Sequence, residues 1–576
     1  MTEPARNPMS VPGLPSLFED LVRGTLRQDL LHPWPQEDAH GRSDSERTAA
    51  ALRELLDDLG DPQTVEETGA LPDGLVDRLR AAGLLHLAVA TEHGGAGLSP
   101  RGVLRVIEAA AGWSPAAGLL LAFHNGLGVP AYLPALAEGP LLDRLRAAIA
   151  DGVLTGAADT EPAGAANAGR QVTATPVEDG AAYLLNGRKI FIGNGPTAGL
   201  LTVTATVDGP DGKRIRQFFV DTATPGFSVA ATHSYMGLRG MPSGLLVLED
   251  VRVPAELVLA EEQPGVWRTP YRSYPLAGGR LQIIAAPSAA IVRQCLEHSR
   301  DFVGRRTVNG RPLAEYDEIR RVVASSLAEL YALESIVEWS TLADAGGRPL
   351  NLVFDRFAAK NITSLLAWRT VERTMTLLAG EGYETAGSKA DRKAAALPLE
   401  RLYRDARGLR VAGGVESLLQ GRLALIALSY FPTGQAEPAA AAQAPTGLSE
   451  RNRAHWRAVA EGALALARTC AGLVEQWPDR RELAAQDRLL VELGRTIEEL
   501  LTMSLVLARA AGRPAQDGRS AGGHEDDQAL ADVFCTEARH RVADAQRRLA
   551  ALTAGTEPDG AALAAGWLAP LPGGAA

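Results

Sequence analysis

The sequence contains little cysteine and no cysteine motif. Its three cysteines, Cys295, Cys470 and Cys535, lie far apart along 576 residues. No C-x-x-C pair or Cys/His cluster is present, so neither a zinc site nor a disulfide framework is indicated. Widely spaced cysteines within helical patterns are typical of buried, reduced thiols in a cytosolic protein.

Positive charge is also scarce, and long apolar runs are absent. Lysine and arginine number 58 against 69 aspartates and glutamates, for a net charge of −11. This balance argues against a nucleic-acid partner, which would need a basic face. No run of about 18 uncharged apolar residues appears, so no membrane-spanning helix is predicted. The N-terminus MTEPARNPMSVPG lacks a signal-peptide pattern, and we expect a soluble cytoplasmic protein.

The spacing of apolar residues changes twice along the chain. From Arg47 to Ala150 it is helical, with Leu52, Leu55 and Leu56 as one example. Short β-branched or alternating segments, separated by Gly, Pro, Asn and Asp, then predict an antiparallel β domain. These segments are 172–177, 183–192, 200–207, 216–221, 227–232 and 244–254. Helical spacing returns over 276–431.

The composition beyond residue 431 predicts a linker and an appended helical domain. PTGQAEPAAAAQAPTG at 432–447 has linker composition. Three helical stretches follow, at 449–477, 480–511 and 526–552. We therefore expect a mainly α protein with a central β domain. Its predicted parts are an N-terminal extension (1–45), an N-terminal α-helical domain (46–153), a middle β domain (154–262), a helical bundle (263–433), a linker (434–447) and a C-terminal helical domain (448–576).

Several motifs follow one another in a characteristic order. They are TEHGGAGLS (91–99), DTEPAGAANA (159–168), LNGRKIFIGNGP (185–196), MGLRGMPSGLLVLEDVRVP (236–254), GRRTVNGRPLAEYDEIR (304–320) and LERLYRDARGLRVAGGVESLLQ (399–420). In this order they resemble the acyl-CoA dehydrogenase superfamily. QDRLLVELGRTIEELLTMSLVLARA (486–510) and ADVFCTEARHRV (531–542) are similar to the extra C-terminal domain of its very-long-chain branch. The resemblance covers nearly the whole chain.

The resemblance implies a fold and an activity. The fold is an N-terminal helical domain, an antiparallel β-barrel domain and a helical bundle, with FAD between the last two, plus a C-terminal helical domain. Family members oxidise an acyl thioester between Cα and Cβ: a carboxylate removes the α-proton, and hydride passes to the flavin. Their electrons leave to an electron-transferring flavoprotein. Members with the extra domain are typically homodimers, and the implied substrate is an acyl-CoA or an acyl-carrier-protein thioester.

The carboxylate that removes the proton is missing from its usual position. The resemblance aligns the Glu of the family's E-G-T with Gly413, and the second family location of the base falls at Gly279, which is vacant too. Glu416 is a candidate base because three residues along a helix span only ~4.5 Å. The helix N-terminus, however, favours its ionised form, so capping is the alternative role. Glu381 and Glu384 flank a Gly-rich turn and are either bases or solvated turn residues.

The flavin positions implied by the resemblance are partly kept. Phe191 can stack in place of the family's Trp, but Gly193 replaces a Thr that meets the flavin, and Ala166 replaces a Ser whose hydrogen bond is worth about 1 kcal/mol. Backbone amides of the turn 377–384 can still hold phosphate oxygens. Arg280 and Ala166 are expected at the substrate pocket, and no metal site is expected. The full set of implied FAD positions is Asp159, Thr160, Ala165, Ala166, Phe191, Gly193, Arg306, Asn309, Thr376, Gly380, Val415 and Ser417.

Three functions stay open at this point. The first is an FAD-dependent oxidation of an acyl thioester, with Glu416 or a substrate group as the base. The second is a catalytically inactive partner that keeps the fold and binds an acyl thioester. The third is a flavin-dependent oxidation of a non-thioester substrate, such as an amine or a nitroalkane.

Overall fold

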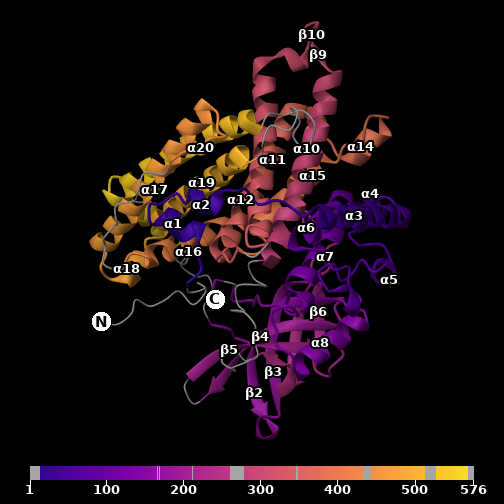
Figure 1. The fold of residues 1–576 in the computed structure, drawn as a ribbon. Helices are drawn as coiled ribbons and strands as arrows, with labels where there is room; N and C mark the ends of the chain where they lie inside the picture. The colour runs from indigo at the N-terminus through magenta and orange to yellow at the C-terminus, as the bar shows by residue number, and fades with distance from the viewer. Residues whose placement is uncertain are drawn as a thin grey trace.

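The order of the structural elements confirms the predicted fold class. The computed structural model describes residues 13–164, 166–167, 169–209, 212–259, 278–345, 348–432, 443–512, 527–558 and 560–568. Helices come first, a β-sheet region follows, and further helices complete the chain; the sheet lies below the helices in Figure 1. The predicted boundary at 262–263 and most of the predicted linker lie outside the described residues.

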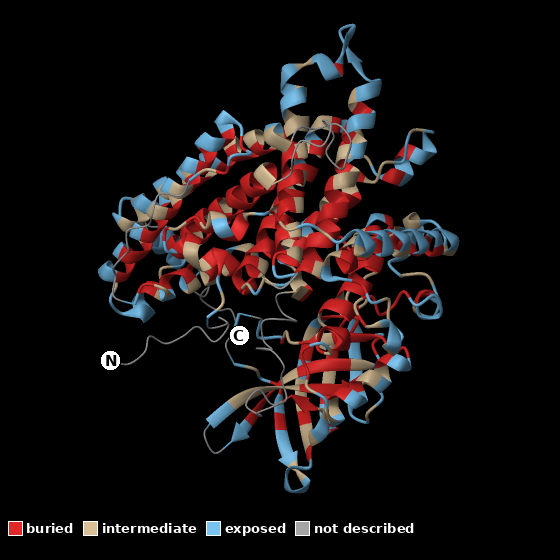
Figure 2. Ribbon diagram, in the orientation of Figure 1, coloured by how far each residue is buried: buried red, intermediate tan, exposed pale blue. Residues whose placement is uncertain are grey.

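The N-terminal helices build one side of the core beneath the later helices. They are α1 (Leu17–Val22), α2 (Gln28–Leu31), α3 (Ala39–Leu59), α4 (Pro62–Thr68), α5 (Leu75–Ala81), η1 (Thr91–His93), α6 (Pro100–Trp113), α7 (Pro115–Gly126), η2 (Val129–Ala131) and α8 (Pro140–Ala150). The predicted Gly-rich turn leads into α6, where Ser99 accepts a hydrogen bond from the backbone of Gly102 and Pro100 takes the first helical position. Helix α7 is buried along almost its whole length (Figure 2).

The β domain is one eight-stranded sheet. Its strands are β1 (Thr155–Ala158), β2 (Thr173–Val177), β3 (Ala182–Gly193), β4 (Leu200–Gly209), β5 (Gly212–Asp221), β6 (Phe227–Thr232), β7 (Ser243–Pro254) and β8 (Val258–Leu259), with η3 (Glu178–Gly180) and η4 (Ala255–Leu257) between them. The order is β6-β7-β3-β2-β4-β5-β8, with β1 beside β4. All six predicted strand segments are confirmed. Most pairs are antiparallel as predicted, but β1 and β2 each pair with β4 in parallel.

The helical bundle carries the long amphipathic helices that the sequence predicts. It contains η5 (Leu281–Ala285), α10 (Ala286–Arg305), β9 (Thr307–Val308), β10 (Arg311–Pro312), η6 (Leu313–Glu315), α11 (Asp317–Leu342), α12 (Val353–Leu378), α13 (Gly380–Tyr383), α14 (Ala386–Asp391), α15 (Leu399–Val411) and α16 (Glu416–Ser429). The β9–β10 hairpin joins α10 to α11 and projects from the top of the molecule in Figure 1. Figure 2 shows that its exposure contrasts with the buried middle of the bundle.

One stretch of the described chain, Leu399–Ser429, is long and apolar enough by composition to cross a membrane. The structure breaks this stretch at 412–415 into α15 and α16, which have 13 and 14 residues. Each is shorter than the ~20 residues that a spanning helix needs. The sequence-based expectation of no spanning helix stays a prediction.

The appended helices pack against the bundle. They are α17 (Glu450–Gln476), α18 (Arg480–Ala484), α19 (Asp487–Gly512), α20 (Asp527–Thr553) and α21 (Gly560–Leu568). The predicted stretch 480–511 is therefore two helices, divided at 485–486. Helix α19 lies between α16, α11 and α20, and almost every turn of it is buried. All three cysteines are buried free thiols, as predicted.

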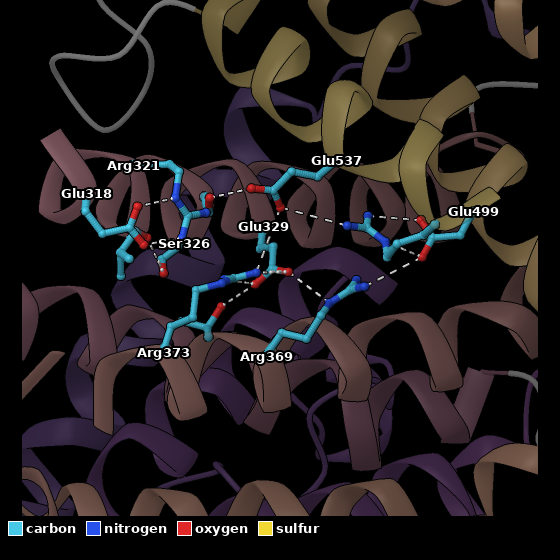
Figure 3. Close-up of polar contacts among 12 residues, drawn as sticks. Glu318, Arg321, Ser326, Glu329, Arg369, Arg373, Glu499 and Glu537 are labelled. Atoms are coloured by element: carbon cyan, nitrogen blue, oxygen red, sulfur yellow. Dashed lines mark hydrogen bonds and ion pairs between the residues drawn. The ribbon is translucent and has the colours of Figure 1, made fainter. Parts of the chain in front are cut away.

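A charged network fastens the appended helices to α11 and α12 (Figure 3). At its centre, the Glu329 carboxylate, 1 % exposed, accepts two hydrogen bonds from Arg373 at 2.6 and 2.8 Å. Arg369 lies 2.9 Å from the same carboxylate and 3.6 Å from Glu499 of α19. Arg541 of α20 then donates to Glu499 at 2.7 and 3.0 Å. The network thus joins four helices from two parts of the chain.

The loop between β6 and β7 attaches the sheet to the bundle. Asp405 of α15 accepts a 2.5 Å hydrogen bond from the backbone N–H of Leu238, and Arg404 donates to the carbonyl of Met236 at 2.6 Å. Arg239 donates to the carbonyl of Glu66 in α4 at 2.6 Å. These contacts hold the MGLRG motif against α15, directly before the helix break that contains Gly413.

Candidate active site

The position of the missing carboxylate, Gly413, is open. It lies in the break between α15 and α16 with φ +71°, next to Gly414 at φ +111°, which are backbone angles that favour glycine. A Cβ atom added at Gly413 would meet only two side-chain atoms within 4 Å: Cε of Lys360 at 3.9 Å and Cγ of Arg280 at 4.0 Å. No side chain of the described residues occupies this Cβ position, and the two side chains nearest to it are cationic.

Lys360 holds the helix break in place. Its side chain is fully buried in α12, and Nζ donates hydrogen bonds to the carbonyls of Arg410 at 3.1 Å and Gly414 at 2.7 Å. These bonds satisfy carbonyl groups at the C-terminal end of α15, which lack helical partners. Burial and the nearby Arg280 guanidinium lower the pKa of Lys360 to about 8.

Arg280 is the second cation at this place. It directly precedes η5, a π-helical turn of the kind often found at functional sites. Its guanidinium lies 5.0 Å from the ring centroid of Phe357, a cation–π contact. Among the described residues, no carboxylate lies within ion-pair distance of Arg280 and no hydrogen bond leaves its guanidinium. Burial and repulsion by Arg422 lower the pKa of Arg280 to about 10.

The second family position for the base, Gly279, is closed. A Cβ atom there would lie 2.3 Å from the carbonyl oxygen of Gly126 and 2.5 Å from Cδ2 of Leu127. The end of α7 therefore packs directly on the backbone of Gly279. Nearby, Oε1 of Gln282 is buried without a hydrogen-bond partner. The two vacant positions differ: one has room for a ligand group, and the other is filled by the chain itself.

Each carboxylate singled out as a candidate base is already paired. The Glu416 carboxylate contacts the guanidinium of Arg410 in α15. Glu381 pairs with Arg305 at 2.5 Å, and this hydrogen bond lowers its pKa. Glu384 pairs with Arg392 at 2.7 Å, which lowers the pKa of Glu384 to about 2. For Glu381 and Glu384 this pairing favours the ionised form and makes the carboxylate a weaker base.

The structure also brings Glu498 close to the helix break, a residue that the sequence analysis did not single out. It is buried in α19, where its carboxyl accepts hydrogen bonds from Asn361 at 3.0 Å and Gln420 at 2.9 Å. Asn361 also donates to the carbonyl of Glu416 at 3.1 Å. Burial raises the pKa of Glu498 to about 8. The sequence signal was a carboxylate pair inside an otherwise apolar helix.

On the sheet side, an aromatic surface stands where the flavin is expected. Phe191 has φ +60° and a ring that is 58 % exposed, 5.0 Å from the ring of His233. His233 in turn stacks near Tyr235 at 5.9 Å. Gly193 has no room for a larger residue, because its Cβ would lie 2.4 Å from the ring of Phe123. The family's Thr is absent here for a packing reason.

The remaining flavin positions lie on separate elements: the α12–α13 turn, the helix break and the sheet side. Gly380 opens α13, and a Cβ there would contact nothing within 4 Å. Thr376, Val415 and Ser417 are exposed around it and around the helix break, as is Ala166 on the sheet side, while Ala165 lies outside the described residues. Asp159 is held by Arg170 at 2.9 Å, and the carbonyl of Thr160 accepts the backbone N–H of Ile190 at 2.9 Å.

Arg306 ends α10 at the base of the projecting hairpin, and Asn309 lies in the hairpin (Figure 1). Arg306 lies 3.4 Å from Glu381, so its charge is partly compensated within the chain. An exposed aromatic ring, an open glycine turn and accessible backbone groups fit an isoalloxazine and a pyrophosphate. These residues therefore suit FAD, although they offer fewer side-chain hydroxyls than the family pattern.

A groove of about 720 Å³ adjoins the helix break on the side of the appended helices. It begins at Ser417 and Arg422 on α16 and runs between α18, α19 and α20. Its charges are mixed, since three arginines face three acidic residues. They are Arg422, Arg488 and Arg548, and Asp487, Glu492 and Glu557.

Comparisons with known proteins agree with this arrangement. Sequence profiles of the acyl-CoA dehydrogenase family match at residues 43–138 (N-terminal domain), 156–251 (middle domain) and 270–425 (C-terminal domain). The chain is 29 % identical to the probable acyl-CoA dehydrogenase FadE10 of Mycobacterium tuberculosis, over 92 % of this chain and 85 % of the relative. It is 30 % identical to the cyclohex-1-ene-1-carbonyl-CoA dehydrogenase of Syntrophus aciditrophicus, over 58 % of this chain and 78 % of that protein.

Solved structures show the same fold. An acyl-CoA dehydrogenase from Bacillus anthracis, complexed with FAD, matches with a TM-score of 0.72 at 21 % identity, over 92 % of both chains. Butyryl-CoA dehydrogenase from Megasphaera elsdenii matches with a TM-score of 0.57 at 25 % identity, over 67 % of this chain and 97 % of that one. The first match extends over the appended helices as well.

The fold and the site define a class of flavin-dependent oxidoreductases. Within it, the chain belongs to the acyl-CoA dehydrogenase family. The family uses FAD, and the protein is an FAD-dependent enzyme. When bound, FAD supplies the acceptor for hydride.

Proposed function

We propose that the protein oxidises an acyl thioester, bound to CoA or to a carrier protein, at the Cα–Cβ bond. One observation supports this most: among the described residues, no side chain covers the ring of Phe191 or occupies the Cβ position at Gly413. Phe191 keeps an exposed ring, and the space beside Gly413 is open. A site that had lost its ligands without any function would be under no constraint to keep both open.

The chain's own residues have separate roles in this proposal. Phe191 and the backbone around Asp159 and Thr160 support the flavin ring, while the turn at Gly380 receives phosphate oxygens through backbone N–H groups. The other implied positions, Ala165, Ala166, Gly193, Arg306, Asn309, Thr376, Val415 and Ser417, complete the FAD site. Arg280 and Ala166 face the acyl group.

The base is the unusual part of the site. Glu416 is a candidate only if its pair with Arg410 opens, and the pair argues for a role in holding α16 against α15. Because Gly413 has no carboxylate, a group carried by the substrate would accept the α-proton in its place. The positioned base of such an enzyme is typically worth 10²–10⁴-fold in rate, so the chemistry needs a replacement.

Glu416→Gln tests this assignment. We expect the anaerobic rate of flavin reduction to stay within about 2-fold of the wild type, because the side chain binds Arg410 rather than the substrate. Arg410→Gln serves as the matched control for loss of the ion pair. A loss of 100-fold or more in Glu416→Gln with normal Arg410→Gln would identify Glu416 as the base.

We also propose that the protein is a cytoplasmic homodimer and that it passes electrons to an electron-transferring flavoprotein. The projecting β9–β10 hairpin carries Asn309 beyond the body of the protomer, with Arg306 at its base, which suits a contact with a second subunit. Membership of the acyl-CoA dehydrogenase family supports an electron-transferring flavoprotein as the electron acceptor.

A second candidate function is favoured by the pairing of Glu416, Glu381 and Glu384. A protein without a free carboxylate at this place would bind a thioester without oxidising it, as a partner of an active relative. The experiment is anaerobic mixing of the FAD-loaded protein with acyl-CoA thioesters of varied length. Bleaching of the flavin absorbance supports oxidation. Tight thioester binding without bleaching supports the binding role, and bleaching only by amines or nitroalkanes contradicts both.

A further inference from the structure

We propose that the space beside Gly413 is a carboxylate-binding subsite, and that the acyl group of the substrate carries the carboxylate that fills it. This inference rests on the proposed thioester oxidation and names its substrate class: thioesters of dicarboxylic acids. The carboxylate that this chain lacks would thus be supplied by the molecule on which it acts.

Geometry gives the first argument. A Cβ atom added at Gly413 would have its two nearest side-chain atoms at 3.9 and 4.0 Å, which is ordinary van der Waals contact, so this carbon fits without a clash. Gly413 itself is exposed, so the space is reachable from the ligand side. Gly279, the other vacant position, is closed by the carbonyl of Gly126 at 2.3 Å. Only one of the two positions can receive a ligand group.

Charge and hydrogen bonding give the second argument. A lysine ammonium has three N–H donors, and Lys360 uses two of them on the carbonyls of Arg410 and Gly414. Arg280 has five donors, and none has an acceptor among the residues that the structure describes. Arg422 lies close enough to repel Arg280. Glu416 and Glu498 lie near Lys360, and Asp159 lies near Arg280, but none of these carboxylates forms an ion pair with either cation. A cationic place with spare donors favours an anion with oxygen acceptors.

Within the described part of the chain, the protein's own carboxylates do not accept hydrogen bonds from the free donors of Lys360 and Arg280. Glu416 is held by Arg410, and Glu381 is held by Arg305 and Arg306. A methyl-ended acyl group would leave the donors of Lys360 and Arg280 without partners in a dry site. Sites built to hydrogen-bond a polar group reject analogues that lack it, because the site's polar groups are then left unpaired.

The test compares matched pairs of ligands on the FAD-loaded full-length protein. Dicarboxylic monothioesters of CoA are set against monocarboxylic thioesters of equal length, with anaerobic flavin bleaching as one readout. Calorimetric binding of the corresponding CoA thioethers, which cannot be oxidised, is the second readout. We expect the carboxylate-ended member to bind at least about 10-fold more tightly and to bleach faster. Equal binding of the two thioethers would overturn the subsite.

Variants at Gly413 sharpen the test. Asp and Asn both tolerate the left-handed backbone angle of this position and have nearly the same size. Gly413→Asp places a carboxylate beside Lys360 and Arg280, so we expect it to remove the preference for carboxylate-ended ligands. Gly413→Asn should keep most of that preference. Equal behaviour of the two variants would contradict a charge-based subsite.

Further measurements distinguish failure of the proposed subsite from failure of the proposed thioester oxidation. Arg280→Gln should weaken binding of the carboxylate-ended thioether by about 10-fold more than binding of the methyl-ended one; equal losses for both would contradict the assignment. Added acetate that restores bleaching by methyl-ended thioesters would show a site for free carboxylate, and would overturn the substrate-borne source. If no thioester bleaches the flavin but the thioether preference holds, thioester oxidation fails and the subsite stands.

Discussion

At the scale of single residues, Glu498 and its neighbour Glu499 illustrate how different partners shift the pKa of adjacent carboxyl groups in opposite directions. In α19 Glu498 is buried and Glu499 is partly buried. Glu498 has only amide donors, and its pKa rises to about 8. Burial also acts to raise the pKa of Glu499, but Arg541 and Arg369 outweigh it and lower the pKa. Adjacent positions on one helix therefore have opposite dependences on pH.

Glu498→Gln tests the first of these effects. In the folded state Glu498 resists ionisation up to about pH 8, whereas the unfolded chain ionises near its ordinary pKa of 4.5. Its contribution to stability is therefore lost as pH rises between these two values. We expect the variant and the wild type to melt at similar temperatures at pH 5. At pH 8 the variant should be more stable, by up to about 4 kcal/mol.

Glu499→Gln is the matched control for that experiment. Because the folded-state pKa of Glu499 is lowered, its stabilising contribution is present above its unfolded pKa, and the variant should melt lower than the wild type at pH 8. Parallel melting curves for the two variants across this pH range would contradict the assignment. Calorimetry at both pH values decides between the outcomes.

At the scale of elements, the network between α11, α12, α19 and α20 fastens the appended helices to the bundle. Its central carboxylate, Glu329, contacts Arg369 and Arg373 in a place that solvent does not reach. We expect Glu329→Gln to destabilise the protein by about 3 kcal/mol, because the buried carboxylate is lost and two partly buried guanidinium groups lose this counter-charge. Calorimetric melting temperatures of the wild type and of Glu329→Gln measure this loss of stability.

Glu318→Gln provides the comparison on the same helix. Glu318 pairs with Arg321 at 2.6 Å, but both side chains are more than half exposed, and such surface pairs contribute little. The melting temperature should not change measurably. If Glu318→Gln cost as much as Glu329→Gln, the importance of the buried network would be contradicted.

The sequence was informative about elements and much less so about contacts across the chain. All six strand segments could be predicted, because β-branched alternation between turn residues is a local signal. The vacancy at Gly413 could be found from the motif around it. Its lining by Lys360 and Arg280 could not, since these residues are separated from it by about 50 and 130 positions and meet it only through packing. The ring of Phe123 behind Gly193 is a second contact of this kind.

At the scale of the whole molecule, the flavin positions lie on separate elements of one protomer. Phe191 and Gly193 lie on the sheet, whereas Arg306 and Asn309 lie at the projecting hairpin (Figure 1), with Arg306 beside α13. A second copy of the chain would give the hairpin a role at the neighbouring cofactor. We expect light scattering to give twice the mass of the 60.7 kDa chain; a monomer at micromolar concentration would contradict this.

The central claim is that an acyl thioester is oxidised although position 413 carries no carboxylate. A single turnover of the FAD-loaded protein with a dicarboxylic monothioester of CoA, analysed by mass spectrometry, tests it most directly. We predict a product that has lost two hydrogens, in proportion to the flavin that is bleached. Recovery of the unchanged thioester, with the flavin still oxidised, from this and from every matched monocarboxylic thioester would contradict the claim.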